Sequence, residues 1–371
     1  MTATTQGISL KERLLAEFEI RKTGLLLDNP LLDNFRSSSA AAFAASGFPT
    51  RKDEEYKYLR FEKLSKAEIS VPFTAPELSK SNKAGTTAIP ENAIEVSIVN
   101  GFPVFNRNGL EFQPEGLEIL HLGEAIRNNN KHVISLLGTI VKPGTDPFSA
   151  LNSAMFMDGI FIHLKKNANL NQALVIHEIT EAGSSAFAQN RILLLAEQNS
   201  AMQVYHLQTA NGTETYANTV VEAELERNAH VTWTCVQDEN RDSIHITNSG
   251  THIYSGAVFN HILVSLGGSL CRNNTALVME EEGSEGHLYG YYHPKGEESI
   301  DNHTVVDHRK PNCNSNELYK GVVSGKGTAV FNGKIFVQKD AQKTNAFQSN
   351  KNILLSEGAS VNTQTSARNL C

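Results

Sequence analysis

The sequence has 371 residues, a mass of 40.6 kDa and a formal net charge of −7. This length predicts roughly two domains or one elongated domain, and a composition of 40% hydrophobic and 20% charged residues excludes a disordered chain. The mildly acidic balance argues against a nucleic-acid partner or an anionic membrane partner, because binding to phosphate groups requires a concentrated basic surface.

Residues 1–60 have a helical pattern. Ser9 is a capping-type residue, and it precedes a run with apolar residues at helical spacing, namely Leu14, Leu15, Phe18 and Ile20. A second, alanine-rich run covers residues 31–43 and ends near residues 47–49, where a glycine and a proline form a stop signal. We therefore expect two helices at the start of the chain.

The rest of the first 150 residues predicts a mixed α/β region. The charged segment 52–59 is interpreted as an amphipathic helical turn that packs Tyr56 and Leu59. Residues 72–92 are rich in Pro, Ser, Lys and Gly, which is typical of a linker or a long surface loop. Short strands are expected at 93–99, 102–105 and 117–120, and one helix is expected between Gly123 and Leu137.

From about residue 154 the pattern changes to strands without intervening helices. The expected strands are 160–164, 174–179, 192–196, 202–206, 219–225 and 231–237, and the series continues to residue 361. Asn, Gly, Ser and acidic residues separate them. The chain contains 34 asparagines, which tolerate the left-handed backbone conformation that sharp corners require.

A corner made of small residues recurs through this region. It appears at Ala201, Ala229, Ala257 and Ser284, at intervals of 28, 28 and 27 residues, and further corners lie near residues 341 and 359. A fixed period of this size that contains only short strands is typical of a solenoid. One turn cannot bury its own apolar face, so successive turns must stack at about 4.8 Å to build a continuous core.

A parallel β-helix fits this pattern better than a sandwich or a barrel. Antiparallel hairpins favour two-residue Asn-Gly or Asp-Gly connections. Asn-Gly occurs four times in the chain, and only two of these pairs, at Asn211 and Asn332, lie in the repeat region. We therefore predict a mainly β protein, with an N-terminal helical and mixed α/β region in residues 1–150 and a parallel β-helix core in residues 151–371.

A histidine-rich stretch at residues 286–308 is a candidate metal site. Asp301 and His303 alternate along an expected strand and would project from one face, and Asp307 and His308 could join them from the next rung. The alternative is a solvated sheet face with His–Asp hydrogen bonds across strands. The sequence leaves both interpretations open.

Other patterns that suggest chemistry have simpler explanations. The Gly-Lys pairs at Lys326 and Lys334 do not match the phosphate-loop pattern and are interpreted as turns. No G-x-S-x-G nucleophile motif is present. Cys271 has Arg272 beside it, but adjacent strand residues point to opposite faces, which favours a buried, inert thiol. The acidic run at residues 280–282 is interpreted as a solvated corner.

The sequence contains no pattern for a membrane span, for export or for a cysteine-based site. It has no run of about 18 uninterrupted apolar residues, and its first 20 residues lack a basic segment followed by an apolar one. The cysteines are far apart and form no CxxC pair: Cys235, Cys271, Cys313 and Cys371. We expect a cytoplasmic protein with reduced cysteines.

The last part of the chain contains several motifs in one order: Asp301-x-His303-Thr304-x-Val306-x-His308, Ser315-x-x-x-Tyr319-Lys320-Gly321, Val330-Phe331-Asn332-Gly333-Lys334-Ile335-x-Val337, Ala341-Gln342-Lys343-Thr344-x-Ala346-x-Gln348-x-Asn350 and Asn352-Ile353-Leu354-Leu355-Ser356. Together these motifs resemble the SufB/SufD family of iron–sulfur cluster assembly scaffolds. Near the start, Gly47-Phe48-Pro49 and Glu54-Glu55-Tyr56-Lys57-Tyr58 look like the family pattern G-x-P…E-x-W-K-Y, with Tyr56 where Trp is usual. The early position of that segment and the moderate chain length favour the SufD branch.

The resemblance implies a right-handed parallel β-helix and a non-enzymatic subunit of a complex. Its implied partners are a SufB-like paralogue, bound through the C-terminal end of the β-helix, and a SufC-like ATPase; a homodimer is an alternative. It implies no cofactor held stably by this chain alone. A transient iron–sulfur cluster would form in the assembled complex, where reduced flavin is a further candidate.

The resemblance ends after Asn362-Thr363. The family continues there with PQLEI, then DDVKCSHGAT, then a helical domain that docks SufC, whereas this chain continues to Cys371 with a different sequence. Bases that encode residues 365–371, read one position later, specify Pro-Gln-Leu-Glu-Ile. We therefore hypothesise a one-base insertion near codon 365, which would leave an unpaired strand edge on the last rung. The histidine of the family's CSHG motif has no counterpart, so we assign no catalytic residue or metal ligand and leave cofactor-binding residues open.

The leading hypothesis is therefore a scaffold or accessory subunit of the SUF assembly complex, which takes part in cluster formation and iron acquisition. The alternative is a β-helical carbohydrate-active enzyme of the lyase type. That alternative requires an exported chain and a groove lined by Asp, Lys and Arg. A hexapeptide-type acyltransferase would require a six-residue apolar period, which the sequence does not show.

Overall fold

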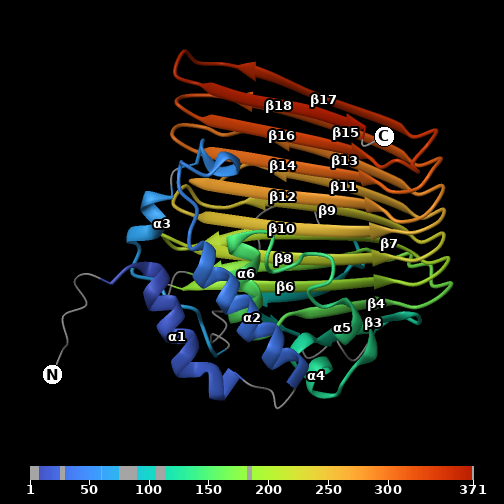
Figure 1. Ribbon diagram of the computed structural model, residues 1–371, viewed down its shortest axis with the longest axis horizontal. Coiled ribbons are helices and arrows are strands. Elements are labelled where there is room, and N and C mark those ends of the chain that lie inside the picture. Colours follow the sequence, from blue (N-terminus) through green and yellow to red (C-terminus); the bar gives the residue numbers. More distant parts are fainter. Residues whose placement is uncertain are drawn as a thin grey trace.

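The computed structural model describes residues 8–25, 30–59, 61–74, 90–105, 113–181 and 186–369. Its main body is a stack of strands in two sheets, with helices packed outside (Figure 1). The first sheet contains β1 (Ile94–Val99), β2 (Phe102–Val104), β5 (Leu174–Glu181), β7 (Ala201–Asn211), β9 (His230–Asp238), β11 (Val258–Ser265), β13 (Glu285–Tyr292), β15 (Asn314–Val323) and β17 (Asn345–Leu354). The second sheet contains β3 (Leu117–His121), β4 (Ile160–Leu164), β6 (Phe187–Ala196), β8 (Tyr216–Leu225), β10 (Ile244–Ile253), β12 (Leu270–Met279), β14 (Ser299–His308), β16 (Thr328–Val337) and β18 (Ser360–Asn369).

Successive strands from β4 onward alternate between the two sheets, so each turn of the chain adds one strand to each sheet. These strands pair in parallel with the strands of the turns before and after them, for example β8 with β10 and β9 with β11. Among the described strands, antiparallel pairs occur only at one end of the stack, between β1 and β2 and between β3 and β4. The result is a parallel β-helix of about seven turns, which confirms the predicted mainly β fold.

Asparagines at the corners hold successive turns together. Asn167, Asn199 and Asn228 each have a positive φ, between 57° and 62°. The side-chain amide of Asn228 donates to Asn199 Oδ1 at 3.0 Å, and the amide of Asn199 donates to Asn167 Oδ1 at 3.1 Å. On the next turn Gly256 takes the same conformation (φ 65°), and an added Cβ there would collide with Asn228 Oδ1. These corners therefore favour Asn or Gly for their backbone conformation, as the composition predicted, although Lys343 takes the same conformation at a later corner (φ 58°).

The predicted corner period is wrong by one residue in its first interval. Strand pairing places Ala201 opposite His230, an offset of 29 residues, and His230 opposite Val258, an offset of 28. The small residue that faces the interior on the first of these turns is therefore Ser200, which is 1% exposed, in line with Ala229. Small residues on both sides of a corner made the two registers indistinguishable in sequence.

The helical elements belong almost entirely to the N-terminal part of the chain. They are α1 (Leu10–Leu25), α2 (Pro30–Ser46), the 3-10 helix η1 (Glu54–Tyr56), α3 (Glu62–Lys66), α4 (Leu122–Arg127), α5 (Lys131–Leu136) and α6 (Pro147–Met155). The predicted cap of α1 is confirmed, since Ser9 N donates to Glu12 Oε2 at 2.9 Å and Glu12 N donates to Ser9 Oγ at 3.3 Å. Most of the predicted linker at 72–92 lies outside the described residues.

Two predictions in this part are corrected. The single helix expected between Gly123 and Leu137 is split into α4 and α5, because Asn129 has a φ of 52° and Asn130 caps α5 with its side-chain oxygen. Helix α6 was not predicted, although Asp146 followed by Pro147 is a recognisable helix start. Helix α6 crosses the domain boundary predicted at residue 150, and that boundary stays a prediction.

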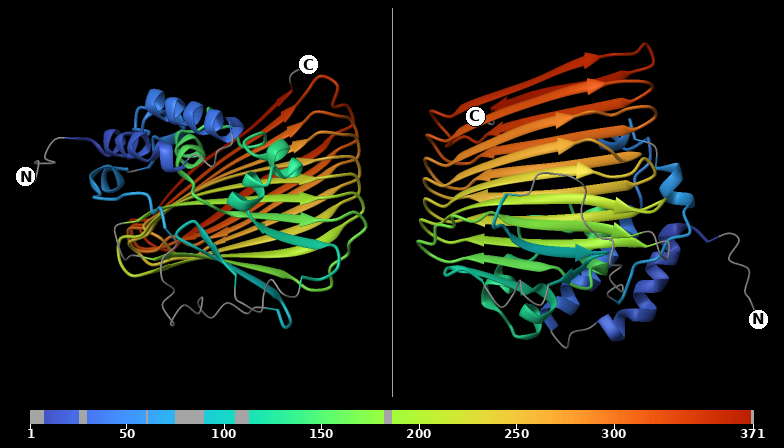
Figure 2. Two further views of the ribbon diagram at one scale, coloured as in Figure 1. Left: turned by 90° about the horizontal axis from the view of Figure 1, so that it is seen from below. Right: turned by 180° about the vertical axis from the view of Figure 1, so that it is seen from behind.

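The N-terminal helices cover the outer face of the second sheet (Figure 2). Apolar side chains of α1, α2 and α6 pack against outward-facing residues of that sheet, which are Phe187, Tyr216, Ile244, Ile246 and Leu270. Inside the β-helix a separate apolar core runs from Ile94 to Ile335. The second sheet is therefore buried on both faces over several turns, and β4, β6 and β8 have no exposed residue.

Candidate functional site

The segment around Tyr56 docks on the outer face of the second sheet. Tyr56 and Leu59 are 6% and 1% exposed, as predicted for this segment. The Arg272 guanidinium lies 4.6 Å from the centre of the Tyr56 ring and donates to the backbone oxygen of Glu55 at 2.9 Å. The hydroxyl of Tyr56 donates to Asp146, the cap of α6. Burial raises the pKa of Tyr56, so its hydroxyl stays a hydrogen-bond donor.

One of the histidine-rich candidates, His303, lines a cleft beside the docked segment with a volume of about 350 Å³, and Asp301 is buried next to His303. His303 Nε2 lies 3.0 Å from Asp301 Oδ1, and His303 Nδ1 lies 3.1 Å from Glu55 Oε2. Arg272 pairs with Asp301 at 2.5 Å, and Lys334 pairs with Glu55 at 2.6 Å. Hydrogen bonds from His303 and Lys334 lower the pKa of Glu55 to about 2 although burial opposes this.

The candidates Asp307 and His308 do not join Asp301 and His303. The candidate metal site of four residues is therefore wrong. The side chain of Asp307 contacts Arg309 at 2.9 Å. His308 faces the interior, where its Nε2 lies 2.9 Å from Ser315 Oγ, and burial lowers its pKa to about 4. Asp307 and His308 are adjacent on one strand and therefore point to opposite faces. Asp301 and His303 instead contact each other within one strand, and Asp301 is 1% exposed, so they do not form the solvated face with His–Asp hydrogen bonds across strands that the alternative interpretation expected.

The remaining sequence candidates are structural. Cys271 is fully buried, its thiol donates to Gly267 O at 3.1 Å, and burial raises its pKa, as predicted for an inert thiol. Cys371 lies outside the described residues. Lys326 lies in a turn, but Lys334 lies within β16, so the second Gly-Lys pair is not a turn. The acidic run 280–282 is a corner, and its Glu280 pairs with Arg309 at 2.8 Å.

A column of hydrogen-bonded polar side chains runs through the interior of the β-helix. We call it the polar column; it contains Glu178, Asn190, Gln208, Thr219, Gln237, Asn273 and Asn302, all at most 4% exposed. Gln208 Nε2 donates to Glu178 Oε2 at 3.3 Å, and Gln237 Nε2 donates to Gln208 Oε1 at 2.8 Å. Gln237 also donates to Asn273 Oδ1 at 3.0 Å. Because an unpaired polar group is costly in this environment, the connected network fixes the stacking of these turns.

A buried charge lies at one end of the polar column. His206 Nε2 is 2.7 Å from Glu178 Oε2, and His245 lies between Glu178 and Glu239, at 3.3 Å and 2.8 Å. Burial alone would raise the pKa of Glu178, but the hydrogen bond from His206 and the charge of His245 lower it to about 2. Burial opposes charge on His245, but Glu239 and Glu178 raise its pKa. Glu178 is therefore ionised inside the β-helix.

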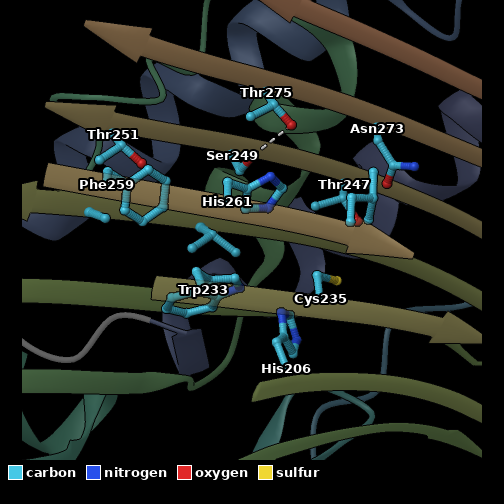
Figure 3. Close-up of a pocket in the computed structure, with 13 residues that line it drawn as sticks. His206, Trp233, Cys235, Thr247, Ser249, Thr251, Phe259, His261, Asn273 and Thr275 are labelled. Carbon is cyan, nitrogen blue, oxygen red and sulfur yellow. Dashed lines mark hydrogen bonds between the residues drawn. The ribbon is translucent and has the colours of Figure 1, made fainter. Parts of the chain in front are cut away.

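Next to the polar column lies a small cavity (Figure 3). His206 on β7 and Cys235 on β9 are paired neighbours that line it. Trp233, also on β9, and its paired neighbour His261 on β11 line it as well. Burial raises the pKa of the Cys235 thiol and lowers that of His261 to about 4, so both groups are neutral. The cavity volume is about 20 Å³, which is room for a single water molecule. It is too small for a substrate.

Glu317, near the other end of the interior, should make the free energy of unfolding depend on pH. It faces inward on β15, Gln348 donates to its Oε2, and burial raises its pKa to about 7 from an ordinary value of 4.5. Since the folded-state pKa is the higher one, Glu317 destabilises the fold increasingly as pH rises from about 4.5 to about 7. Glu317→Gln should therefore match the parent at about pH 4 and exceed its free energy of unfolding by about 1–3 kcal/mol at about pH 8.

Chemical unfolding of both proteins across this pH range checks the prediction. Glu357→Gln, which changes an exposed carboxylate, serves as the control and should change stability by less than about 0.5 kcal/mol throughout. A stability difference for Glu317→Gln that does not grow with pH would contradict the argument.

The polar column was not predicted from the sequence, although a signal was present. Glu178, Gln208 and Gln237 occupy the same inward position on three successive turns of the first sheet. Once the register is known, polar residues recur in step with the period. The repeat of small residues at the corners was easier to recognise than the repeat of inward-facing polar residues.

Two family models match the chain in order. The model described as "SufBD protein N-terminal region" matches residues 19–176, and the model described as "SUF system FeS cluster assembly, SufBD core domain" matches residues 177–364. The chain belongs to the SufBD family. The resemblance inferred from the motifs is therefore confirmed, and the protein is an accessory subunit of the SUF iron–sulfur assembly system.

Curated relatives of this SufBD protein match it over most of its length. An iron–sulfur cluster assembly SufBD family protein of Synechocystis is 25% identical over 350 residues, covering 91% of this chain and 76% of the relative. The iron–sulfur cluster assembly protein SufD of Escherichia coli is 27% identical over 338 residues, covering 86% and 73%. The chloroplastic protein ABCI7 of Arabidopsis thaliana is 23% identical over 342 residues, covering 89% and 70%. None of the described helices is both long and apolar enough to cross a membrane.

Proposed function

We propose that this SufBD protein is a non-enzymatic scaffold that supports cluster assembly together with a SufB-like paralogue and a SufC-like ATPase. The observation that carries the proposal is the match of both SufBD family models, in order, to a chain that folds as one continuous β-helix. The iron–sulfur cluster is then the cargo of the complex, formed at contacts between subunits and held only transiently. Reduced flavin, if the complex uses it, would act in the assembled state.

The charged cleft beside Tyr56 supports a scaffold over a lyase. A lyase needs a base and a cation free to meet its acidic substrate. Arg272 and Lys334 are paired with Asp301 and Glu55. The Lys334–Glu55 pair and the hydrogen bond from Arg272 to the backbone oxygen of Glu55 join the N-terminal segment to the β-helix. Their role is to attach one part of the chain to another.

The end of the β-helix offers the proposed contact with the paralogue. Leu354 on β17 and Val323 on β15 occupy the same position on successive turns. Val323 is fully buried, whereas Leu354 is 50% exposed, and the adjacent Leu355 is 61% exposed. No described strand pairs with the outer edges of β17 and β18. A paralogue with the same fold could add its own strands there and cover these side chains. We assign the ATPase contact to no described residue.

Co-expression tests the proposal. The tagged chain is produced with the SufB-like paralogue and the ABC-type ATPase of its host, and the purified material is analysed by size-exclusion chromatography with light scattering. We expect a complex of all three chains that accumulates more iron–sulfur cluster than the same preparation without this chain. Purified protein that binds neither partner and releases unsaturated sugars from polyuronate would contradict the proposal and support the lyase.

A further inference from the structure

Three metal-ligating side chains from distant parts of the sequence meet near one end of the β-helix. His132 lies on α5, His163 on β4, and Glu197 directly after β6. One ligand atom from each lies within 4.8 Å of the other two. Figure 1 places α5 and β4 at the opposite end of the stack from β17 and β18. The cluster is therefore separate from the proposed partner contact and independent of the proposed function.

The contacts hold the three side chains toward one another. His163 Nε2 lies 2.9 Å from Glu197 Oε1, and the rings of His132 and His163 have centroids 4.9 Å apart. A tetrahedral ion with bonds of about 2.0–2.2 Å separates its ligand atoms by about 3.3–3.6 Å. Small side-chain rotations would bring the three donors to that spacing.

Neighbouring groups position two of these donors. Glu118 Oε2 lies 3.3 Å from His163 Nδ1, so the Nδ1–H can donate a hydrogen bond to the carboxylate and leave the lone pair of Nε2 for a metal ion. The backbone N–H of Lys166 donates to Glu197 Oε2 at 2.8 Å and leaves Oε1 directed at the cluster. Carboxylates that orient a ligating histidine in this way are a regular feature of metal sites.

We propose that His132, His163 and Glu197 bind a divalent first-row transition metal ion, with Glu118 as a positioning residue. Two imidazoles and one carboxylate suit Zn²⁺, Fe²⁺, Co²⁺ and Ni²⁺ rather than Mg²⁺ or Ca²⁺. Three protein ligands leave a position open to water or to an incoming ligand. His132 and Glu197 are only partly buried, so the ion can exchange with solvent.

Cobalt binding tests the site. Metal-free full-length protein is titrated with Co²⁺, followed by its visible d–d absorption, and the bound Co²⁺ is then displaced with Zn²⁺. We expect one Co²⁺ per chain with the intense bands of a four- or five-coordinate ion. His132→Ala and Glu197→Gln should each weaken binding by at least about 10-fold. His132 is on a partly exposed helix face, so this variant should fold, and its thermal unfolding is measured alongside.

His177→Gln is the matched control. His177 is as buried as His163, and its Nε2 lies 2.9 Å from Glu95 Oε2, but no third donor joins this pair among the described residues. It should bind Co²⁺ as the parent does. The proposal is overturned if the parent binds no more Co²⁺ than the folded His132→Ala and Glu197→Gln variants, or if His177→Gln loses binding to the same extent.

Discussion

Glu222→Ala is expected to lower the free energy of unfolding by about 3–5 kcal/mol, the cost of breaking a buried ion pair from one side. Glu222 on β8 and its partner Arg191 on β6 are both completely buried. The substitution leaves the guanidinium of Arg191 without its counter-charge inside the protein.

The same carboxylate also holds a loop against the β-helix. Its Oε2 accepts the backbone N–H of Gly138 at 2.9 Å, and its Oε1 accepts those of Ile140 and Val141 at 3.1 and 3.0 Å. Gly250, opposite Glu222 on β10, makes room for this loop, because an added Cβ would lie 2.7 Å from Ile140. Removing the carboxylate leaves three N–H groups without their acceptor, which adds to the cost.

Urea unfolding measures the effect, with Glu224→Ala as the control. Glu224 lies on the same strand and the same face but is partly exposed, and its replacement should change stability by less than about 1 kcal/mol. Equal losses for both variants would show that the face tolerates no alanine and that the ion pair has no special role.

Leu354→Asp is expected to weaken association with the SufB-like paralogue by about 30-fold or more. An apolar side chain at the centre of an interface contributes about 2 kcal/mol or more when it is a hot spot, and about 1.4 kcal/mol corresponds to a factor of ten. In Leu354→Asp, the partner would bury the new carboxylate at the interface without a positive charge to pair with it. The affinity is measured by calorimetry or by surface plasmon resonance with the immobilised paralogue.

Ile20→Asp is the control for this prediction. Ile20 on α1 is also an exposed apolar residue, at 78%, but it lies among the N-terminal helices. Its replacement should leave the affinity within about threefold of the parent. If Leu354→Asp binds equally well, the contact lies elsewhere on the molecule; if both variants self-associate as the parent does and bind no paralogue, a homodimer is the better account.

Much of the fold could be predicted because it repeats. Three patterns indicate the same repeating turn of the β-helix: the corner asparagines, the short apolar strands and the near-constant period. Together they are stronger evidence than any one of them. The cap at Ser9 and the burial of Tyr56 and Leu59 were also predictable, since capping and helical periodicity depend on residues close in sequence. The error of one residue at Ala201 shows the limit of this signal, because two small neighbours look alike until strand pairing selects one of them.

The candidate sites were harder because they combine residues that are far apart in sequence. Asp301 and His303 were correctly placed together by strand alternation, but the same alternation separates Asp307 from His308. Their partners Glu55 and Arg272 could not be deduced, since Glu55 comes from a segment nearly 250 residues away. The polar column could be recognised only after the register was known.

The sequence by itself determined the repeating turn, its corners, the N-terminal helices and membership in the SufBD family, because these features are written in periodic or local patterns. Only the tertiary structure decided which polar groups meet: the ion pair of Arg191 and Glu222, and the cluster of His132, His163 and Glu197. The reason is physical. A side chain's direction follows from its own strand or helix, but its neighbours depend on how separate elements pack, and that packing is set by many apolar contacts together.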